Sequence, residues 1–561
     1  MVEKLTGGQA LARAILRMGT ERIYGIAGTS NVAFLDALYE VRDRLRYVSC
    51  RHEQVAASMA DAEGRLTGRP GVVLVHSGPG ALNAMISAGN ALKDSSPMII
   101  VSGAVKRRLK HSDGMLELEH TRVFAPVCKE TLRVESAPEV PATFSEAYRV
   151  CMSASRGPVL IEVPEDVWQE QADIDIDSMM LEADVPTPVN PADVAMAIEM
   201  LSTARLPLIL SGGGVAYSHS GDLLVRLAEE LQVPVITTGN GRGTIPETHP
   251  LSFGRVGFGG GNLIADKALE RCDALVCLGA GISDMTTYEF TAPVGAQRIM
   301  IVNISAGSIA PQAPKGVVVF CDVADFLGQA VEQAEGRAGG SMESWNEAIA
   351  GARATWQSMA RASIDRESAR PSAAKVISSL AAMVPGDTIV SVGAGMHLLY
   401  PMTFMPCNHP LSFLSTVNFG SMGFGMAAAM AARMAYPDRT AIAFLGDGDF
   451  MMTIQDLETA VRECIGMKVF VINDYQYRVL NFRQRLQFAG RICGTEHGNP
   501  DFADVARCFG AAGYRLDEPG KIDEILAAAV AVEGPVVVDV IIDPEDLPPM
   551  NLEANLRMSA G

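Results

Sequence analysis

Two acidic turns, each directly after an apolar run, carry the strongest chemical signal in the chain. Gly446-Asp447-Gly448 follows the predicted strand Ala441–Leu445, and Asn473-Asp474 follows the predicted strand Lys468–Ile472, with residues 449–472 (24 residues) between the turns. Parallel strands end at one edge of a sheet, where α/β proteins bind ligands. Two carboxylates there suit Mg²⁺, and a helix that starts after a glycine turn favours phosphate. A lone Gly-Asp-Gly is only a turn, so the prediction depends on the pair.

Further candidate residues lie beside other turns and loops. Glu53 follows the predicted strand Tyr47–Cys50, and His76 precedes Ser77-Gly78. Glycines let the backbone approach a ligand closely, which makes two Gly-rich loops, Gly393–His397 and Asn418–Gly425, candidate ligand contacts. Each feature also has a purely structural interpretation: a helix-capping glutamate, a histidine packed beside a loop, or a Gly-rich helix start with a core methionine.

Short apolar runs alternate with helical patterns and would position these residues. Continuous Val/Ile/Leu strands separated by helices indicate parallel sheets covered on both faces. The predicted strands are Gly71–Val75, Pro97–Ser102, Val159–Val163, Pro207–Leu210, Val233–Thr237, Ala274–Leu278, Ile299–Ile304, Thr388–Val392, Ala441–Leu445, Met467–Ile472 and Val536–Ile541.

This alternation of apolar runs and helical patterns starts three times along the chain, and two other segments separate the three stretches. Residues 173–191 are acidic and then Pro-punctuated, and residues 336–341 are Gly-rich and precede a helical pattern over Glu343–Glu367. We therefore predict an α/β protein of three doubly wound parallel-sheet domains, at residues 1–172, 190–335 and 371–550.

Composition narrows the class of protein. The 561 residues are 48% hydrophobic and 20% charged, and the formal net charge is −19. Such acidity argues against nucleic acid, whose phosphates require basic patches. No apolar run approaches the roughly 20 residues of a membrane span, and Glu3 and Lys4 interrupt the start of the chain, so we expect no membrane segment and no signal peptide. The ten scattered cysteines fit free thiols in a reducing cytoplasm.

The paired turns resemble the signature of thiamine-diphosphate enzymes, and the resemblance extends over nearly the whole chain. It is nearest to the branch of acetolactate synthase and benzoylformate decarboxylase, whose pyrimidine-binding, middle and diphosphate-binding domains come in this order. Within that branch, the sequence motifs most resemble those of flavin-free acetolactate synthases. By register, the resemblance implies Mg²⁺ ligands at Asp447, at Asp474 and at the backbone carbonyl of Gln476.

The resemblance also implies cofactor contacts in the first and third domains. Glu53 matches the glutamate that contacts N1′ of the aminopyrimidine, where a poorly solvated carboxyl group promotes the tautomer that deprotonates thiazolium C2. Met422 matches the apolar residue that wedges between the two cofactor rings. The remaining implied contacts are Gly28, Gly393, Ala394, Gly395, Met396, Gly420, Gly446, Gly448 and Asp449.

Positions around the substrate depart from a single family pattern. Leu116 stands where many carboligases carry a glutamine, and His76 stands where benzoylformate decarboxylase has a catalytic histidine that can relay a proton. Thr29 and Arg478 complete the predicted substrate pocket, although the segment around Arg478 reads equally as a solvated charged helix. Gly281–Met285 lacks the arginines of flavin-binding relatives, and Gly212–Gly214 reads better as a turn than as a dinucleotide site, so we expect no flavin.

The predicted activity is that of a thiamine-diphosphate-dependent 2-oxo acid decarboxylase or carboligase, similar to acetolactate synthase, which forms or cleaves a carbon–carbon bond next to a carbonyl. Two alternatives within the superfamily are an aromatic 2-oxo acid decarboxylase and a 2-hydroxyacyl(-CoA) lyase. An alternative of another class is a non-catalytic regulatory relative. The resemblance further implies a small 2-oxo acid as the partner molecule and a homodimer or homotetramer whose protomers share active sites.

Overall fold

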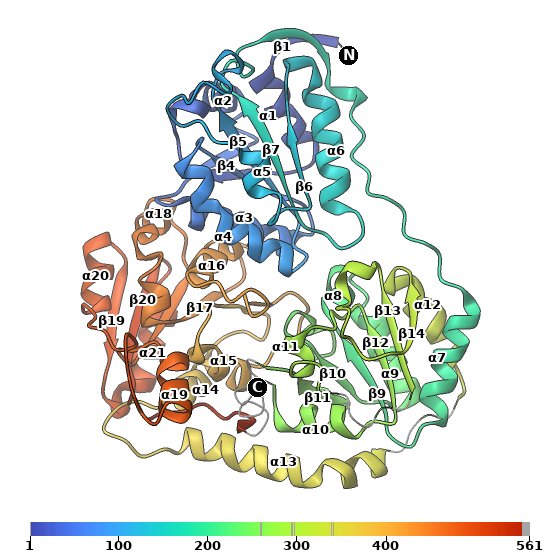
Figure 1. Cartoon of the computed structure of the whole chain (residues 1–561). Coiled ribbons are helices and arrows are strands. Elements are labelled where there is room, and N and C mark those ends of the chain that lie inside the picture. Colours follow the sequence, from blue (N-terminus) through green and yellow to red (C-terminus); the bar gives the residue numbers. More distant parts are fainter. Residues whose placement is uncertain are drawn as a thin grey trace. The chain divides into compact units, whose positions relative to one another are not determined.

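The computed structural model describes residues 2–258, 261–292, 296, 298–337, 339 and 342–552. The chain divides into two compact units. Unit 1 comprises Met1–Val185, Asn418–Asp438 and Met451–Met467, and unit 2 comprises the remaining segments. Three separate six-stranded sheets with parallel pairing carry the fold, flanked by helices (Figure 1). The prediction of three doubly wound α/β domains is confirmed.

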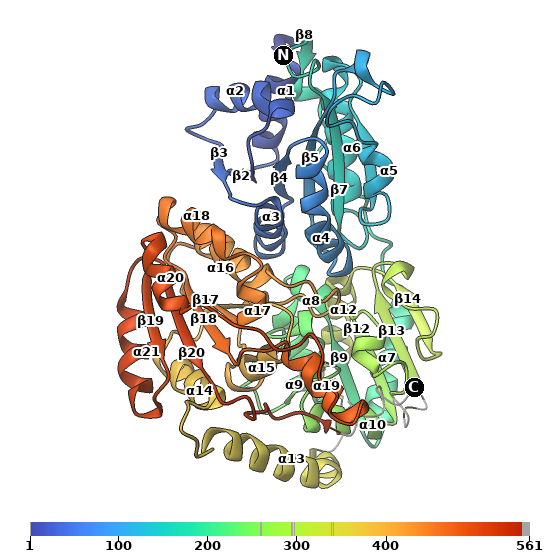
Figure 2. The same cartoon turned by 60° about the vertical axis from the view of Figure 1, so that its left-hand side comes forward.

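The first sheet lies in unit 1 and has the strand order β3-β2-β4-β5-β7-β6. The helices α1 (Gly7–Arg17), α2 (Val32–Glu40) and α6 (Val140–Met152) share one apolar core with it. The helices α3 (Glu53–Thr67) and α4 (Pro79–Lys93) lie side by side, and α3 packs on β4 (Figure 2). The strands are β2 (Arg22–Gly25), β3 (Arg46–Ser49), β4 (Gly71–Val75), β5 (Met98–Ala104), β6 (Glu130–Arg133) and β7 (Pro158–Pro164).

Two helices from the C-terminal part of the chain complete unit 1. These are α16 (Phe424–Ala435) and α18 (Leu457–Arg462). The sheet covers α3 on one side and α16 packs against it as well, so that every residue of α3 from Glu53 to Leu66 is buried. The Tyr436 hydroxyl donates to the Leu66 carbonyl at 2.8 Å and joins the ends of the two helices.

The middle sheet lies in unit 2 and has the order β11-β10-β9-β12-β13-β14. Alternate strand residues face two cores. One core includes α7 (Pro191–Thr203), α9 (Gly221–Leu231) and α12 (Val323–Ala334), and the other includes α10 (Leu263–Arg271) and α13 (Met342–Ile364). The strands are β9 (Pro207–Ser211), β10 (Val235–Thr237), β11 (Ser252–Arg255), β12 (Ala274–Leu278), β13 (Arg298–Asn303) and β14 (Val317–Phe320).

The third sheet, also in unit 2, has the order β16-β15-β17-β18-β20-β19. Its core includes α14 (Ala373–Met383), α15 (Leu399–Phe404) and α21 (Ile522–Ala531), while α20 (Phe502–Phe509) packs on β19 and β20. The strands are β15 (Ile389–Val392), β16 (Phe413–Leu414), β17 (Ala441–Gly446), β18 (Lys468–Asn473), β19 (Ala512–Leu516) and β20 (Val536–Ile541).

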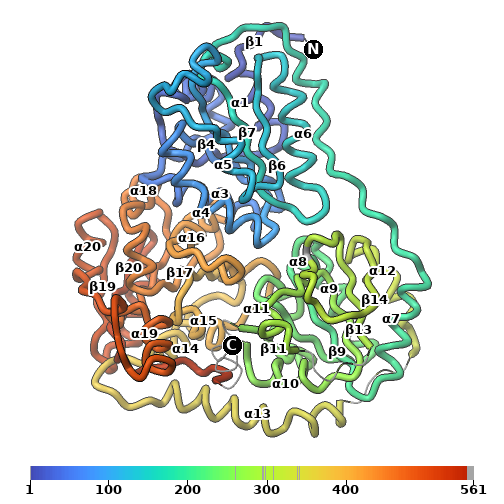
Figure 3. Tube along the Cα trace, viewed as in Figure 1, coloured from blue at the N-terminus to red at the C-terminus, as the bar shows by residue number. Residues whose placement is uncertain are grey.

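One segment differs from the sequence-based expectation of a linker at residues 173–191. The strand β8 (Gln171–Asp175) pairs antiparallel with β1 (Val2–Thr6), and a 3₁₀ turn follows at Ile176–Ser178. Only Met179 to Asn190 runs without regular secondary structure (Figure 3). Within the described residues, none of the helices combines the length and the apolar character needed to cross a membrane.

Candidate active site

The Gly-Asp-Gly turn lies at the carboxyl end of β17, where α17 (Asp447–Phe450) begins. Asp447 is buried, and its Oδ1 accepts from the Gly448 amide at 2.8 Å. Its Oδ2 accepts from Asn499 Nδ2 at 2.7 Å and lies 3.2 Å from His497 Nε2. Asn499 Nδ2 also reaches Asn473 Oδ1, at 2.9 Å, and so ties this turn to the end of β18.

Asp474 lies directly after β18, the strand next to β17. Its Oδ1 accepts from the Gln476 amide at 3.2 Å, and its Oδ2 pairs with Arg478 Nε. Burial raises the pKa of Asp474 to about 6; Arg478 opposes that rise and the nearby charge of Asp447 adds to it. The structure therefore brings the two predicted carboxylates within electrostatic reach of each other.

Two carboxylates of this arrangement have the chemistry that a cation prefers. Two buried carboxylates that repel each other are stabilised when a positive ion binds between them. Among the described residues no three His, Cys, Asp or Glu side chains gather as a metal cluster. The predicted set has only two carboxylates and a backbone carbonyl, and Mg²⁺ usually takes its other ligands from water and phosphate.

Arg478, which the sequence placed in the substrate pocket, is buried, and its guanidinium group is hydrogen-bonded to other groups of the protein. Besides Asp474, it donates to the carbonyl of Asp546 at 2.9 Å and to that of Asp543 at 3.3 Å. Its guanidinium group holds one predicted metal ligand in place and ties the start of α19 (Arg478–Gln487) to the segment after β20.

The glycine loop after β15 contacts the Gly-Asp-Gly turn through His397. The loop Gly393–Met396 follows β15, and a Cβ atom on Gly393 would lie 1.8 Å from Asp449 Oδ2, so only glycine fits there. His397 Nε2 lies 3.5 Å from the same Asp449 oxygen, and a Cβ on Gly446 would approach His397 Nδ1 to 2.8 Å. Burial lowers the pKa of His397 to about 3, which keeps the imidazole neutral.

Glu53 opens α3 at the carboxyl end of β3, in unit 1. The side chain is buried, with 7% of the residue surface exposed. Its Oε2 accepts from Asn83 Nδ2 at 3.0 Å, and a Cβ on Gly80 would lie 2.8 Å from its Oε1. The glutamate is therefore poorly solvated and held from α4, as its predicted role requires.

His76 lies at the end of β4, close to Glu53. Its Nδ1 is 2.8 Å from Ser30 Oγ, and a Cβ on Gly28 would touch the ring. Burial lowers the pKa of His76, the charge of Glu53 raises it, and His120 lowers it further.

Two predicted substrate-pocket residues lie near this histidine. Thr29 is exposed and precedes Ser30 in a 3₁₀ turn. The Leu116 carbonyl accepts from Ser77 Oγ at 2.8 Å, and Leu116 has a φ of 68°. The structure thus gathers Glu53, His76, Thr29 and Leu116 around the ends of β2 and β4.

The loop before α16 is fixed against α3 and α4 in unit 1. Gln54 Nε2 donates to the carbonyl of Met422 at 2.8 Å. Asn418 Nδ2 donates to Asp94 Oδ1 at 2.5 Å, and Gly420 has a φ of 76°. The predicted wedge residue Met422 therefore lies beside the start of the helix that Glu53 opens.

The glycine run of the middle domain has a packing explanation. A Cβ on Gly212 would lie 2.3 Å from the Cα of Ala280, and one on Gly214 would lie 2.7 Å from that of Gly279. Ser283, where flavin-binding relatives differ, caps the short helix α11 (Asp284–Thr287). The expected turn at Gly212–Gly214 is wrong, because the helix α8 (Gly213–Tyr217) begins within the glycine run and Gly212 is its N-cap.

Four residues of the site were not predicted as site residues. His397, His497, Asn499 and Asn83 contact predicted residues, but each is brought there by tertiary structure. Two of them had a signal in the sequence: His397 ends the candidate loop Gly393–His397, and Asn499 opens the Asn499-Pro500 pair that precedes α20. Asn499 could have been singled out as a polar side chain at a sheet edge.

Three parts of the chain match domain models of the same enzyme family. Residues 5–123 match the family "Thiamine pyrophosphate enzyme, N-terminal TPP binding domain", residues 194–330 match its central domain, and residues 393–540 match its C-terminal TPP binding domain. The acetolactate synthase large subunit of Parasynechococcus marenigrum and the acetolactate synthase of Mycobacterium bovis are each 30% identical, over 96% of this chain and 88% of theirs. The acetolactate synthase large subunit of Haemophilus influenzae is 28% identical, over 97% of this chain and 95% of its own.

Proposed function

Because the chain belongs to the acetolactate-synthase-like thiamine-pyrophosphate enzymes, we propose that it decarboxylates pyruvate and joins the resulting two-carbon unit to a second 2-oxo acid. Family membership makes the chain a thiamine-diphosphate-dependent enzyme with carboligase and decarboxylase chemistry, and the proposal adds the donor and the product class. The observation that carries it most is the pair Asp447 and Asp474 at neighbouring strand ends, with the glycine loop Gly393–Met396 against the same turn. The non-catalytic alternative does not fit an enzyme of this family.

Thiamine diphosphate, when bound, supplies a carbon nucleophile at C2 and an electron sink. In our proposal Glu53 holds a proton at N1′, and its burial keeps water from taking over that contact. Met422 would lie against the two rings of the cofactor as the predicted wedge residue. Its carbonyl is fixed by Gln54, the neighbour of Glu53, so the acid and the wedge are positioned together.

At the other end of the cofactor, we propose that Asp447, Asp474 and the Gln476 carbonyl hold Mg²⁺. The backbone amides of Gly393–Met396 and Gly446–Gly448 would face the diphosphate. Asp449 is turned toward Gly393 and His397, so its role is to shape the loop Gly393–Met396 and not to contact phosphate directly.

At the substrate end, we propose that His76 moves a proton to or from the substrate carboxylate or carbonyl. Its lowered pKa favours the neutral imidazole, which can accept that proton. Leu116 offers no side-chain hydrogen bond and favours an apolar substrate face. Arg478 is a positioning residue for Asp474.

A substrate panel tests the proposed reaction. Purified enzyme with Mg²⁺ and thiamine diphosphate is incubated with pyruvate alone, with pyruvate plus a second 2-oxo acid, and with phenylglyoxylate, and both carbon dioxide and carboligation product are measured. The proposal requires carbon dioxide and a stoichiometric acetolactate-type product from pyruvate. Turnover of phenylglyoxylate alone would replace it with an aromatic 2-oxo acid decarboxylase.

Purified enzyme is expected to be colourless and fully active without added flavin. The reason is the sequence Gly281–Met285, which lacks the arginines of flavin-binding relatives, together with the packing of Gly212–Gly214 against Gly279 and Ala280. An absorbance spectrum with protein quantification checks this. A flavin band at one equivalent per chain would contradict it.

We also propose a cytoplasmic homodimer, or a tetramer of two such dimers. All ten cysteines are free thiols, which suits a reducing compartment. Within one chain α3 packs against α16, and these helices belong to different domains of the sequence. Two copies can exchange this contact for the same contact between chains, and a closed two-fold arrangement then makes two equivalent sites.

Co-assembly of two inactive variants is expected to restore activity. Glu53→Gln and Asp447→Ala chains mixed at random give half heterodimers, and an exchanged interface leaves one of their two sites intact. Activity should therefore reach about a quarter of wild type in the unfractionated mixture and about half of wild type in the isolated heterodimers. Co-expression with two affinity tags and assay of doubly purified protein measures it. No recovery in verified heterodimers would place each site within one chain.

A further inference from the structure

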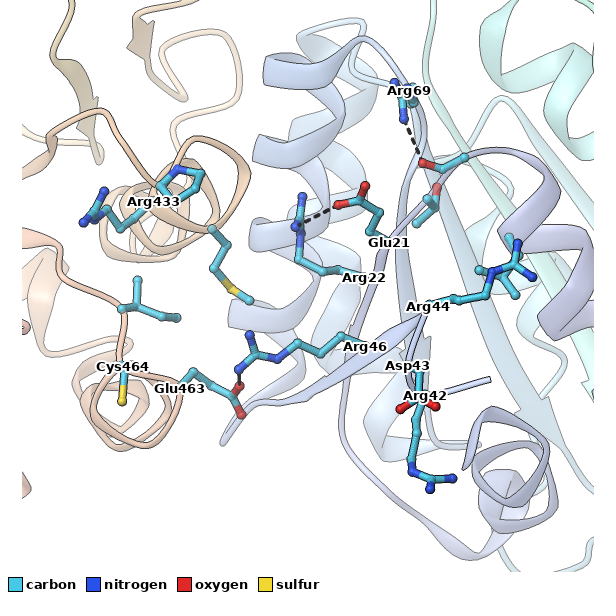
Figure 4. Close-up of a pocket in the computed structure, with 16 residues that line it drawn as sticks. Glu21, Arg22, Arg42, Asp43, Arg44, Arg46, Arg69, Arg433, Glu463 and Cys464 are labelled. Atoms are coloured by element: carbon cyan, nitrogen blue, oxygen red, sulfur yellow. Dashed lines mark hydrogen bonds and ion pairs between the residues drawn. The ribbon is translucent and has the colours of Figure 1, made fainter. Parts of the chain in front are cut away.

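A cavity lies in unit 1, at the opposite ends of the strands from Glu53. It has a volume of about 860 Å³, within the range of small-molecule sites (Figure 4). Its walls come from the starts of β2 and β3, the loop after α2, and the chain just beyond α16 and α18. Arg46 opens β3 whereas Glu53 follows its end, so the length of the strand, about 13 Å for four residues, separates the cavity from the cofactor contact.

Arginine dominates the lining of this cavity. The lining includes three carboxylates, those of Glu21, Asp43 and Glu463, and a larger number of arginines. The six arginines are Arg22, Arg42, Arg44, Arg46, Arg69 and Arg433. The lining therefore carries a positive excess in a chain whose net charge is −19. Such a local reversal of charge attracts an anion.

Several of these guanidinium groups are held in place before any ligand binds. Arg22 donates through Nε and Nη2 to Glu63 Oε1, at 3.1 and 2.7 Å, and Arg69 Nη1 donates to the Gly19 carbonyl at 2.8 Å. Arg46 pairs with Glu463 across the cavity, from β3 to the end of α18 (Figure 4). Arg69 and Arg46 are each anchored through one nitrogen, which leaves their other nitrogens for a ligand and reduces the entropy that binding costs.

The loop after α2 adds cations that are exposed to solvent. Arg42 lies over the Tyr39 ring at 3.9 Å and donates to the Tyr39 carbonyl at 2.7 Å, while Arg44 is exposed. The carboxyl ends of α16 and α18 bring partial negative charge to the opposite wall, and basic residues in their last turns, Arg433 and Arg462, offset it.

We propose that this cavity binds an anion with two or more phosphate groups. Guanidinium forks match phosphate oxygens bidentately, and several arginines on separate elements suit a ligand whose charges are spread over neighbouring groups. A single phosphate or carboxylate would contact only part of the lining. The cavity is large enough for a nucleoside diphosphate as well as for a bare diphosphate.

Titration calorimetry on the holoenzyme tests this site, with thiamine diphosphate and Mg²⁺ saturating so that the cofactor site is filled. Inorganic pyrophosphate and ADP are each expected to bind at low salt with a dissociation constant below about 0.5 mM, at least ~10-fold tighter than orthophosphate. Binding should weaken as ionic strength rises, because the contacts are partly exposed. ADP binding tighter than pyrophosphate would identify a nucleotide ligand, and equal affinities would identify the diphosphate group alone.

Variants locate the binding. Arg46→Ala and the exposed double variant Arg42→Ala/Arg44→Ala are each expected to weaken pyrophosphate binding at least ~10-fold. Arg46→Lys keeps the charge but not the planar fork and should weaken binding less than Arg46→Ala does, and Arg271→Ala, an exposed arginine at the end of α10, should not change it. Absence of saturable binding of either probe up to about 5 mM, or wild-type affinity in both Arg46→Ala and the double variant, would overturn the proposal.

Discussion

Glu53→Gln is expected to lower kcat at least ~10²-fold, the lower end of what a positioned acid–base group contributes. Glutamine has the same shape and can still accept from Asn83, so the start of α3 should keep its structure. It has no acidic proton to share with N1′. Because only 7% of Glu53 is exposed, water cannot replace the missing group. Steady-state carbon dioxide release from pyruvate, with thiamine diphosphate titrated in parallel, measures the effect.

Two controls separate this chemical effect from a structural one. Glu182→Gln, an exposed glutamate in the segment before α7, should retain wild-type kcat. Cofactor affinity of Glu53→Gln should stay within about tenfold of wild type, because the diphosphate and metal contacts are untouched. A near-normal kcat in Glu53→Gln would remove Glu53 from the mechanism, and a loss of cofactor affinity as large as the loss of rate would make it a binding residue.

The sequence predicted the interior strands best because they are apolar on both faces. β4, β12 and β20 have the predicted bounds, and each is buried along its whole length between two helix layers. The strand β8 was mistaken for a linker. Its residues are mostly half-buried or exposed, and its partner β1 lies far away in the sequence, so no local pattern marks it.

The same reasoning explains what the sequence revealed of the site. Asp447 and Asp474 could be placed together because each follows a strand of one parallel sheet. Their partners could not be predicted in this way. His497 and Asn499 reach Asp447 from a segment without regular structure, and Arg478 looked like part of a solvated helix although it is buried against Asp474. Long-range contacts of this kind depend on how loops fold back, which periodicity does not encode.

The proposed metal site is expected to depend on His497, Asn499 and Arg478 as well. Asn499→Ala removes the 2.7 Å donor to Asp447 Oδ2 and a link to Asn473. Substitutions that disturb the orientation of a metal ligand typically cost about 10–100-fold in metal affinity. Asn499→Ala is therefore expected to lower the metal affinity by less than Asp447→Ala does.

Asp447→Ala is expected to weaken Mg²⁺ and thiamine diphosphate binding together, by at least ~100-fold, more than loss of an outer contact costs. Removing the carboxylate takes away a proposed ligand and leaves Asn499 Nδ2 with only Asn473 as an acceptor. Because the metal would bridge protein and diphosphate, loss of one must lower the affinity of the other. Calorimetry with each component titrated in the presence of the other measures this coupling. Asp438→Ala, an exposed aspartate before β17, should change neither affinity. Unchanged affinities in Asp447→Ala, or loss of Mg²⁺ binding with diphosphate binding intact, would place the metal site elsewhere.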